Sequence, residues 1–310
     1  MKVCVIGSGG REHALAWRLS ISPSVTKVYA IPGSAAMSDC AELVGIDWQQ
    51  SDHLIRFLKD NHVDLVVVGP EAPLVAGLAD VLNKAGIPVF GPSKAAAQLE
   101  GSKVFAKDLM KKYNIPTAAY GVFHKVDEAK EFIAQTGAPI VVKADGLAAG
   151  KGVVVAMTVE EANAAVEDML SGNRFGEAGS TVVIEEFMDG EEASLLAFVD
   201  GKTVVPMIAS QDHKRIFDGD KGPNTGGMGT YAPAPVLTDA LRDEAMKTIL
   251  EPMVAAMEKE GMPYVGCLYA GLMITPQGPK VVEFNARFGD PETQVVLPLL
   301  DSDLGQIMMA

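Results

Sequence analysis

The chain has 310 residues, of which 48% are hydrophobic and 21% charged, and its formal net charge is -14 at pH 7. This length allows two or three domains with sizeable cores, and the composition is typical of a soluble globular protein. The negative charge argues against non-specific binding of nucleic acid and against binding to an anionic membrane surface.

The cysteines and the N-terminal sequence indicate the cellular compartment of the protein. Three cysteines without a CxxC pair exclude a zinc ribbon and disfavour a disulfide framework. No apolar run is long enough to cross a membrane, and the strand-like start KVCVIGSGG is too short for a signal peptide. We therefore expect a cytoplasmic protein whose partners are small molecules, with no nucleic-acid or membrane partner.

Apolar runs alternate with amphipathic segments over the first hundred residues. The expected strands are KVCVIG, KVYAIPG, DLVVVGPE and PVFGPS, and the expected helices are REHALAWRLS, DHLIRFLKDN and GLADVLNKAG. Continuous apolar strands that alternate with helices are typical of a parallel sheet covered on both faces. The sequence therefore predicts an α/β, Rossmann-like N-terminal domain over residues 1–102.

Strand-like runs dominate residues 103–310, after a helical stretch KAAAQLEGSKVFAKDLMKKY. A smaller unit at about 120–190 has strands APIVVKADG, GVVVAMT and STVVIEEFM, and Thr158 and Glu161 form a capping-box pattern. A second unit at about 191–310 contains a hairpin that turns at 200–201 and the strand-rich LYAGLMITPQGPKVVEFN. We expect an α+β domain of two subdomains. Since DSDLGQIMMA has no C-cap signal, we also expect the natural chain to continue.

The segment DGDKGPNTGGMGTYAPAP is long and rich in glycine and proline. Such segments in compact domains are usually functional or disordered loops. Its lysine and asparagine content favours a functional loop.

The first glycine-rich turn, GSGGREHA, only partly fits a dinucleotide-binding motif. Gly7 and Gly9 fit G-x-G-x-x-G, but Glu12 occupies the third position, and the second strand ends in Ile-Pro-Gly without the acidic residue for a ribose. A tight turn before a helix N-terminus still favours an anion, and Arg11 adds charge. The alternative is a glycine turn needed only for packing.

The segment GLAAGKG, residues 146–152, is close to a P-loop but has the wrong glycine spacing and lacks the Ser or Thr after the lysine. It lies between two expected strands, so no helix dipole stands behind it. The segment is therefore predicted to be a flexible lid that folds over a nucleotide.

Several polar residues at strand ends predict a nucleotide site. Glu283 and Asn285 are two apart on an expected strand, so both face one side and suit Mg²⁺. Lys143 ends an apolar run and could hold phosphates, and the glutamates around Phe187 could contact a nucleobase and a ribose. The alternatives are an ordinary polar strand face, a snorkelling lysine and charged strand ends.

Together these segments resemble the ATP-grasp superfamily and, within it, the phosphoribosylamine–glycine ligase family. The motifs follow the family order over nearly the whole chain. They are GSGGREHAL, VVVGPEAPL, LEGSKVFAKDLM, VVKADGLAAGKGVVVA, VIEEFMDGEEAS, QDHKRIFDGDKGPNTGGMGTYAPAP and EFNARFGDPETQ. The family also has a C-terminal domain of roughly a hundred residues, on the size typical of domains, which we expect this sequence to lack.

The resemblance implies that ATP, glycine and 5-phosphoribosylamine give glycinamide ribonucleotide, ADP and phosphate in purine biosynthesis. ATP would first convert the unreactive glycine carboxylate into an acyl phosphate, and the amine would then displace phosphate. Charge on the transferring phosphoryl oxygens calls for a metal ion and cationic side chains, and the water-sensitive acyl phosphate calls for a lid.

The resemblance also implies roles for individual residues. ATP would be bound by Lys103, Lys143, Gly146, Gly150, Lys151, Gly152, Glu185, Phe187 and Glu192. Glu283 and Asn285 would ligate Mg²⁺ or Mn²⁺. Arg287 would stabilise the acyl phosphate, with Asp212 and Lys214 as further catalytic residues. The substrate-binding residues would be Gly9, Gly10, Arg11, Glu12, Pro70, Glu71, His213, Asn224, Thr225, Gly226 and Gly227.

One departure concerns the metal site. Many ATP-grasp enzymes supply another acidic ligand from the strand before EFN, but here Gly271 stands near the expected place. The site would then depend more on phosphates and water.

Three alternatives remain open from the sequence. The chain could be a different ATP-grasp ligase or carboxylase, because the N-terminal and 211–231 segments choose the substrate. It could be a nicotinamide oxidoreductase, which the broken glycine motif disfavours. It could also be a binding protein that holds ATP without turnover if a missing domain closes the site.

Overall fold

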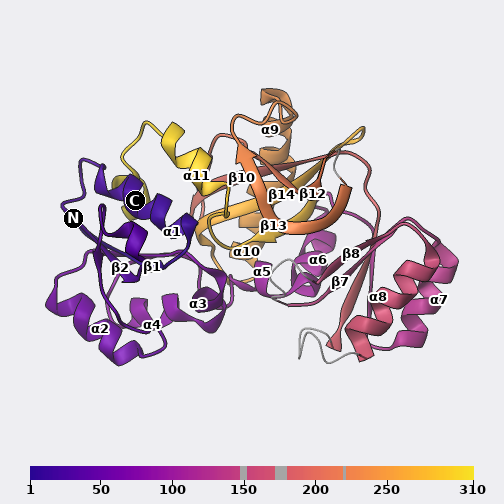
Figure 1. The fold of residues 1–310 in the computed structure, drawn as a ribbon, viewed down its shortest axis with the longest axis horizontal. Helices are drawn as coiled ribbons and strands as arrows, with labels where there is room; N and C mark the ends of the chain where they lie inside the picture. Colours follow the sequence, from indigo (N-terminus) through magenta and orange to yellow (C-terminus); the bar gives the residue numbers. More distant parts are fainter. Residues whose placement is uncertain (147–151, 172–179, 219–220) are drawn as a thin grey trace.

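The computed structural model describes residues 1–146, 152–171, 180–218 and 221–310 (Figure 1). Within the last two ranges, the side chains at positions 214, 215, 221, 223, 224 and 226 are not described. The described residues form two sheets flanked by helices, a further sheet that carries its own helices, and a two-stranded ribbon.

The N-terminal part contains a parallel sheet, as predicted, and the short strand β3 extends it to five strands. Its strands lie in the order β3-β2-β1-β4-β5. They are β1 (Lys2–Gly7), β2 (Lys27–Pro32), β3 (Glu42–Leu43), β4 (Leu65–Val68) and β5 (Val89–Phe90). The helices between them are α1 (Gly10–Ser20), the 3₁₀ turn η1 (Ala35–Met37), α2 (Ser51–Asp60), α3 (Glu71–Ala76) and α4 (Leu78–Lys84). The central strands β1 and β4 are buried because helices cover both faces, which explains their uninterrupted apolar sequences.

The expected single helical stretch before residue 116 is two helices, α5 (Gln98–Gly101) and α6 (Lys103–Lys112). Ser102 separates them because its backbone is extended, with φ -139 and ψ 116. Its hydroxyl accepts a hydrogen bond from Phe105 N at 3.1 Å, so Ser102 is the N-cap of α6.

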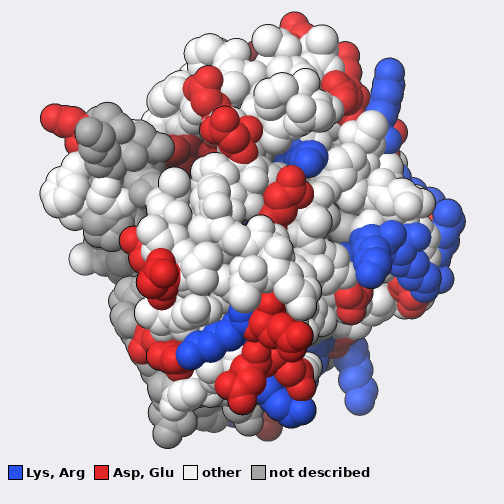
Figure 2. All heavy atoms as spheres, turned by 90° about the vertical axis from the view of Figure 1, so that its right-hand side faces the viewer, with Lys and Arg blue, Asp and Glu red and all other residues white. Residues whose placement is uncertain are grey.

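The unit at about 120–190, called here the lid sheet, has four antiparallel strands in the order β6-β9-β7-β8. They are β6 (Tyr120–Phe123), β7 (Ile140–Ala144), β8 (Val153–Ala156) and β9 (Val182–Glu186), with α7 (Val126–Thr136) and α8 (Val159–Ser171) packed beside them (Figure 1). Thr158 caps α8 through Glu161 N, whereas the Glu161 carboxylate binds Met157 N, so the capping box is only half formed. On the outer face of this unit, acidic and basic side chains of the described residues are interspersed (Figure 2).

The third sheet is antiparallel, in the order β11-β10-β14-β15, and we call it the central sheet. Its elements are β10 (Glu191–Asp200), β11 (Val204–Pro206), β14 (Val265–Thr275) and β15 (Gly278–Asn285), with α9 (Asp239–Ala245), the π-helical turn η3 (Met246–Leu250) and α10 (Glu251–Lys259). The predicted hairpin turn is confirmed, since Asp200 Oδ1 accepts hydrogen bonds from the backbone of Lys202 and Thr203 at 2.9 and 2.7 Å. An irregularity between β14 and β15 places Glu283 opposite Gly271.

The expected glycine-rich loop at 218–235 is largely a strand, which corrects the sequence prediction. Strand β13 (Lys221–Tyr231) pairs antiparallel with β12 (Gln211–Phe217), and the two form the ribbon β12–β13. Glycine at 222 and 227 has φ values of +84 and +126, and the register shifts along this ribbon. Backbone pairing therefore forms a strand whose sequence is rich in glycine and lacks apolar alternation.

The last described elements return to the N-terminal part. They are α11 (Thr293–Val296), the 3₁₀ turn η4 (Leu297–Leu299) and α12 (Leu304–Met309). Arg18 on α1 donates to the carbonyls of Leu300 and Ser302 at 2.8 Å each, and the two ends of the chain lie on the same side of the molecule (Figure 1). None of the described helices combines the length and apolar character that crossing a bilayer requires.

The buried apolar side chains divide unevenly among these units. Ile6 on β1 belongs to the same apolar cluster as Leu195 on β10 and Leu268 on β14. The lid sheet has a separate cluster, which includes Ile133 on α7 and Val142 on β7. The parallel sheet and the central sheet therefore share a core, whereas the lid sheet has its own.

Candidate active site

The site lies where the lid sheet meets β15 and α6. The Asp145 carboxylate, just after β7, accepts hydrogen bonds from Lys103 N at 2.6 Å and Val104 N at 3.3 Å at the start of α6. Lys103 Nζ in turn donates to Gly146 O at 2.9 Å. A carboxylate at a helix N-terminus satisfies otherwise unpaired N–H groups. Asp145 therefore fastens the beginning of the 146–152 segment to Lys103.

A buried cluster of charges lies beside it. Glu185 Oε2 is 3.0 Å from Lys143 Nζ and 3.0 Å from Lys107 Nζ, and the three side chains are between 3% and 5% exposed. Lys143 and Glu185 lie on neighbouring strands with their side chains on one face, since Lys143 pairs with Val183 and Glu185 with Val141. Lys143 Nζ also donates to Val282 O on β15, at 3.1 Å. The lid sheet and the central sheet therefore meet at Lys143.

Burial lowers the pKa of Lys107 and of Lys103. Desolvation lowers the pKa of Lys107 from 10.5 to about 8, against the opposing effect of Glu185. Desolvation also lowers the pKa of Lys103, and Glu283 opposes that shift. Since Lys143 lowers the pKa of both, the ammonium groups are close enough to repel each other. A site that concentrates positive charge in this way suits an anionic ligand such as a polyphosphate.

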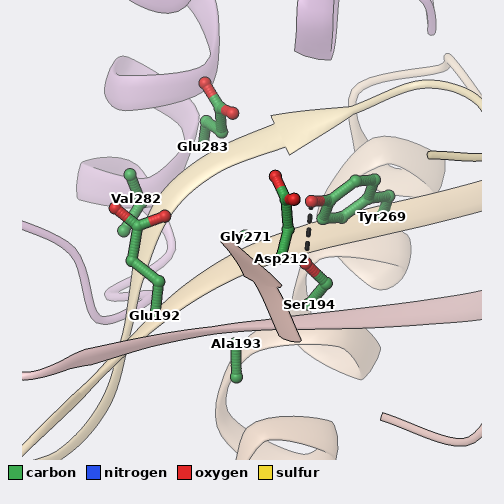
Figure 3. Close-up of a pocket in the computed structure, with 8 residues that line it drawn as sticks. All are labelled: Glu192, Ala193, Ser194, Asp212, Tyr269, Gly271, Val282 and Glu283. Atoms are coloured by element: carbon green, nitrogen blue, oxygen red, sulfur yellow. Dashed lines mark hydrogen bonds between the residues drawn. The ribbon is translucent and has the colours of Figure 1, made fainter. Parts of the chain in front are cut away.

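A small pocket opens next to Glu283 (Figure 3). Three carboxylates from three strands line it, namely Glu192 of β10, Asp212 of β12 and Glu283 of β15, and Gly271 lies between them. On the opposite wall Tyr269 OH is 2.8 Å from Ser194 Oγ and donates to the buried Glu292 at 2.8 Å. Glu192, predicted for the ribose, Glu283, predicted for the metal, and Asp212, predicted for the transferring phosphate, therefore share one pocket.

The side chains of Glu283 and Asn285 provide only part of the ligand set that a hard divalent cation needs. Glu283 and Asn285 are two apart at the end of β15, and Asn285 Oδ1 accepts one hydrogen bond, from Arg287 at 3.3 Å. Within the described ranges, no three His, Cys, Asp or Glu side chains are arranged to hold a metal ion. A carboxylate and an amide oxygen suit a cation that takes its other ligands from phosphate and water.

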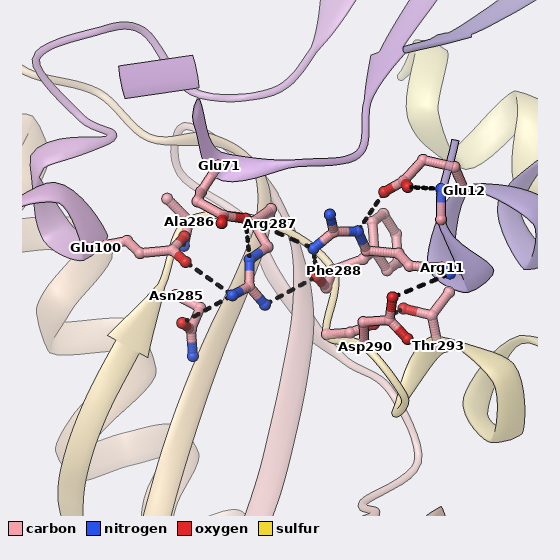
Figure 4. Close-up of polar contacts among 12 residues, drawn as sticks. Arg11, Glu12, Glu71, Glu100, Asn285, Ala286, Arg287, Phe288, Asp290 and Thr293 are labelled. Carbon is pink, nitrogen blue, oxygen red and sulfur yellow. Dashed lines mark hydrogen bonds and ion pairs between the residues drawn. The ribbon is translucent and has the colours of Figure 1, made fainter. Parts of the chain in front are cut away.

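Arg287 is the centre of a second charged cluster (Figure 4). Its guanidinium lies 2.8 Å from Glu100 Oε1 and 3.4 Å from Glu71 Oε2, and it donates to Phe288 O at 3.2 Å. Burial alone would lower the pKa of Arg287, but Glu100 and Glu71 outweigh burial and raise it. Burial raises the pKa of Glu100, against the effect of Arg287. The guanidinium therefore stays charged and fixed in place.

The first glycine turn joins this cluster through Arg11, which donates to Phe288 O at 3.2 Å and lies 3.9 Å from Glu71. The N–H groups predicted to be free for an anion are partly occupied, because Glu12 accepts from Gly9 N at 2.7 Å and Asp290 accepts from Arg11 N at 3.4 Å. The Glu12 side chain lies where a Cβ at Gly7 would lie, 2.4 Å from its Cγ. Glycine is therefore required at position 7, and Glu12 replaces the third glycine of the dinucleotide motif.

The ribbon β12–β13 contributes Asp212 to the wall of the pocket. Gly227, predicted to bind substrate, lies next to Asp212 and Pro291, since a Cβ there would be 2.7 Å from Pro291 Cδ. Thr225 Oγ1 accepts from Gly227 N at 3.1 Å, and His213 is exposed. The side chains of Lys214 and Asn224, and the surroundings of Gly226, are outside the description.

The structure brings most predicted residues into two adjoining clusters. Lys103, Lys143 and Glu185 meet at the junction of the sheets, and Phe187 follows β9, half-buried.

Gly146 and Gly152 flank the β7–β8 connection, where Gly152 O accepts a hydrogen bond from Ala144 N. Gly150 and Lys151 lie outside the described residues. Pro70 is the N-cap of α3, next to Glu71, and Gly10 is the first residue of α1.

Sequence reasoning missed Lys107, Asp145 and Glu100. Lys107 follows Lys103 by four residues in an otherwise amphipathic helix, so its spacing indicates the same helix face. The serine N-cap before Lys103 was a further signal that α6 begins there. No local pattern marks Glu100, whose partner Arg287 is distant in the sequence.

Comparisons with known proteins agree with this architecture. The family model for the N domain of phosphoribosylglycinamide synthetase matches residues 1–100, and the model for its ATP-grasp (A) domain matches residues 101–293. A phosphoribosylamine–glycine ligase of Halalkalibacterium halodurans is 58% identical over 308 residues, covering 99% of this chain and 72% of the relative. That of Brucella melitensis is 59% identical over 304 residues, covering 98% and 71%.

Solved structures show the same relationship. The crystal structure of phosphoribosylamine–glycine ligase from Thermotoga maritima has a TM-score of 0.85 at 35% identity, covering 96% of this chain and 72% of that one. The biotin carboxylase domain of 2-oxoglutarate carboxylase from Hydrogenobacter thermophilus has a TM-score of 0.74 at 18% identity, covering 99% and 68%, and shares the fold. With an N domain followed by an ATP-grasp domain, the chain belongs to the phosphoribosylglycinamide synthetase family.

Proposed function

We propose that the protein ligates glycine to 5-phosphoribosylamine at the expense of ATP, giving glycinamide ribonucleotide, ADP and phosphate through glycyl phosphate. The observation that carries the proposal is the match to both family domains, the N domain and the ATP-grasp domain. The same match decides against the nicotinamide oxidoreductase alternative. A ligase of this kind is an enzyme of purine biosynthesis, and its cytoplasmic location remains a prediction from composition.

The first step is transfer of the γ-phosphoryl group to the glycine carboxylate. Negative charge on the phosphoryl oxygens must be met by groups that are already in place. We assign the ATP phosphates to Lys103 and Lys143, because both ammonium groups are held at the junction between the sheets. Arg287 is assigned to the acyl phosphate, since Glu100 and Glu71 fix its guanidinium beside Asn285.

We propose Glu283 and Asn285 as the protein ligands of a divalent cation, Mg²⁺ or Mn²⁺, carried in with ATP. When bound, the cation neutralises phosphate charge and polarises the transferring group. Asp212, across the pocket from Glu283, and Lys214 are assigned to the region of the transferring phosphate or glycine. Glu192 is placed on the same pocket and is assigned to the ribose hydroxyls.

The second step needs exclusion of water, because water would hydrolyse an acyl phosphate. The β7–β8 connection is the proposed lid. Its base is closed by the hydrogen bond from Ala144 N to Gly152 O at 2.8 Å, and its first residue, Gly146, binds Lys103. Gly150 and Lys151 are assigned to the β and γ phosphates by resemblance to the family.

The acceptor amine would approach from the N-terminal part. Arg11 and Arg287 share Glu71 and the Phe288 carbonyl, so the first glycine turn directly adjoins the residue assigned to the acyl phosphate. This neighbourhood supports 5-phosphoribosylamine as the ligand of Gly9, Gly10, Arg11, Glu12, Pro70 and Glu71. Glycine would lie nearer to His213 and the Asn224, Thr225, Gly226 and Gly227 stretch of β13.

The test is an ADP-release assay with ATP, Mg²⁺, 5-phosphoribosylamine and glycine, with glycinamide ribonucleotide identified by mass spectrometry. We expect release of ADP to require both glycine and the amine. Omitting one substrate at a time, and replacing glycine with other amino acids or bicarbonate, are the controls. Turnover with another carboxylate and none with glycine would point to a different ATP-grasp ligase.

A further inference from the structure

Glu100 is a buried carboxylate that reaches the end of β15 from a distant part of the chain. It lies in α5, 186 residues before Ala286, and its side chain is 8% exposed. Its two oxygens serve two donors, since Oε2 accepts a hydrogen bond from Ala286 N at 2.8 Å and Oε1 binds Arg287 Nη2 at 2.8 Å. An ionised carboxylate has two acceptor oxygens, whereas an amide has one. A carboxylate at position 100 can therefore hold both groups at once, and an amide cannot.

Arg287 passes this constraint on to Asn285 (Figure 4). The same Nη2 atom that binds Glu100 donates to Asn285 Oδ1 at 3.3 Å, and Asn285 is itself only 8% exposed. Glu71 binds the guanidinium less closely, at 3.4 Å, and its side chain is 31% exposed. Glu100 is therefore the main group that holds Nη2 beside Asn285.

The contact with Arg287 selects one orientation of the Asn285 amide. An amide accepts through its oxygen and donates through its NH₂ group, whereas a guanidinium can only donate. If the amide turned over, its NH₂ group would face Arg287 Nη2 and two donors would meet. The oxygen has two lone pairs, of which Arg287 uses one, and a hard cation binds oxygen rather than an NH₂ group. Arg287 therefore fixes where the oxygen of Asn285 lies.

We propose that Glu100 is a positioning residue: it holds Arg287 so that Asn285 presents its side-chain oxygen to the divalent cation. This inference rests on the proposed function, which assigns Asn285 as a ligand of Mg²⁺ or Mn²⁺. Glu100 itself ligates nothing, and its effect passes through Arg287 and Asn285. Groups that orient metal ligands in this way commonly change metal affinity by about 10–100-fold.

Binding of Mn²⁺ in the presence of saturating ADP, followed by electron paramagnetic resonance, tests the assignment without turnover. The neutral-pair variant combines Glu100→Gln with Arg287→Met. It removes one charge of each sign, so the electrostatic effects on the cation largely cancel. Replacing a buried ion pair by uncharged side chains often leaves the fold intact, and the glutamine can still accept from Ala286 N.

In the neutral-pair variant nothing at position 287 donates to Asn285, so its amide can turn over. The affinity for Mn²⁺ should fall by about tenfold or more. The affinity for ADP without metal, measured by titration calorimetry, should stay unchanged, because the variant alters the orientation of a metal ligand and not the nucleotide site.

The matched control combines Glu260→Gln with Lys112→Met. Lys112 Nζ lies 2.6 Å from Glu260 Oε1, and Lys112 is the last residue of α6, at the opposite end from Lys103. The control thus also removes one ion pair, but away from the candidate site. It should leave the Mn²⁺ affinity unchanged, and circular dichroism checks the fold of each variant.

Asn285→Asp separates orientation of the ligand from a general loss of structure. A carboxylate has two oxygens, so it presents an oxygen to the cation even when it turns over. Adding the neutral pair to Asn285→Asp should therefore cost little Mn²⁺ affinity. An equal loss with asparagine and with aspartate at position 285, or no loss in the neutral-pair variant, would overturn the role of Glu100.

The outcome is separable from the proposed function, because binding of Mn²⁺ and ADP requires neither glycine nor the amine. A protein that shows the expected Mn²⁺ affinities but forms no glycinamide ribonucleotide contradicts the ligase activity alone. A protein that forms glycinamide ribonucleotide, and whose neutral-pair variant binds Mn²⁺ as tightly as the unaltered protein, contradicts the role of Glu100 alone.

Discussion

The lid sheet and the central sheet supply different halves of the candidate site and are held in the protein in different ways. Lys143 and Glu185 stand on strands whose buried side chains form a separate apolar cluster. Glu283 and Arg287 stand on or just after β15, within a core that the central sheet shares with the parallel sheet. One half of the site belongs to an independent unit, and the other to the main body.

Because the two halves belong to different units, the lysines assigned to the ATP phosphates lie at the junction between the lid sheet and the main body. Side-chain links between the halves include the hydrogen bond from Lys143 to Val282 O and the ion pair between Lys107 and Glu185. Asp145 also joins the lid sheet to the start of α6. Units with separate cores can move relative to each other at low cost, since few apolar contacts are lost. A nucleotide bound between them would contact both halves at once. We therefore expect loss of Glu283 in the main body to abolish chemistry, and loss of a buried apolar residue in the lid sheet to affect order in that unit alone.

The largest effect is expected from Glu283→Ala, in the main body. Removing the carboxylate leaves Asn285 as the assigned protein ligand of the cation, so metal-dependent turnover should fall by on the order of 10³-fold or more. Because Glu283 is half-buried at a strand end, the melting temperature should change little. Steady-state ADP release and thermal unfolding measure the two quantities.

Gln277→Ala, in the exposed turn of the same β14–β15 hairpin, is the matched control and should retain full activity. Near-normal turnover in Glu283→Ala would show that the cation binds elsewhere.

Next in size is the effect of Arg287→Met on stability. The change leaves the buried Glu100 carboxylate without its main cationic partner, and breaking a buried ion pair in this way costs about 3–5 kcal/mol. Urea unfolding should show that loss. Arg242→Met removes a half-exposed arginine that pairs with Asp239 and Asp243 on α9, and should cost no more than about 1 kcal/mol. Similar losses in both variants would mean that Glu100 is not held by Arg287.

The sequence predicts the parallel sheet well, and for a physical reason. Its strands are buried on both faces, so apolar runs such as DLVVVG are visible locally. The lid strands β7, β8 and β9 are also predicted, and the region of β14 and β15 is expected to be strand-rich. Strand β13 is not, because glycine-rich residues give no local strand signal and its pairing with β12 supplies the hydrogen bonds.

The candidate site likewise contains residues that the sequence predicts and residues that it does not. Lys143, Glu283 and Asn285 are found because each lies at the end of an apolar strand. The partners that set their electrostatics are not found, since Lys107 and Glu100 come from helices and meet Glu185 and Arg287 only in the folded chain. The occupied N–H groups at the start of α1 were also missed, because Asp290 is far away in sequence.

A core substitution tests the separation of the two units directly. Ile133 in the lid sheet and Ile249 in the main body are both fully buried, and Ile→Ala should cost about 2–5 kcal/mol at either position. In Ile133→Ala, hydrogen exchange should speed up in β6–β9 and stay slow in β1 and β4. In Ile249→Ala, protection should fall in the central and the parallel sheet together. Loss of protection in β1 and β4 in the Ile133 variant would contradict independent cores.

The smallest expected effect is a dependence of stability on pH at the junction itself. Burial lowers the pKa of Lys107 from 10.5 to about 8. Between these values the unfolded chain binds more protons than the folded one, so the free energy of unfolding should rise with pH in this window. Below about pH 8 the cost of the buried ammonium is fully present, and it disappears as the pH approaches 10.5.

The measurement compares urea unfolding of the unaltered protein with that of Lys107→Met from pH 7 to 10.5. The difference in unfolding free energy should move by about 1–3 kcal/mol in favour of the unaltered protein. Lys103, whose pKa is also lowered by burial, titrates in both proteins, so most of its contribution cancels in the difference. Lys111→Met should follow the unaltered protein at every pH. A difference that stays constant across the window would mean that Lys107 keeps its ordinary pKa, so that the junction is open to water without nucleotide.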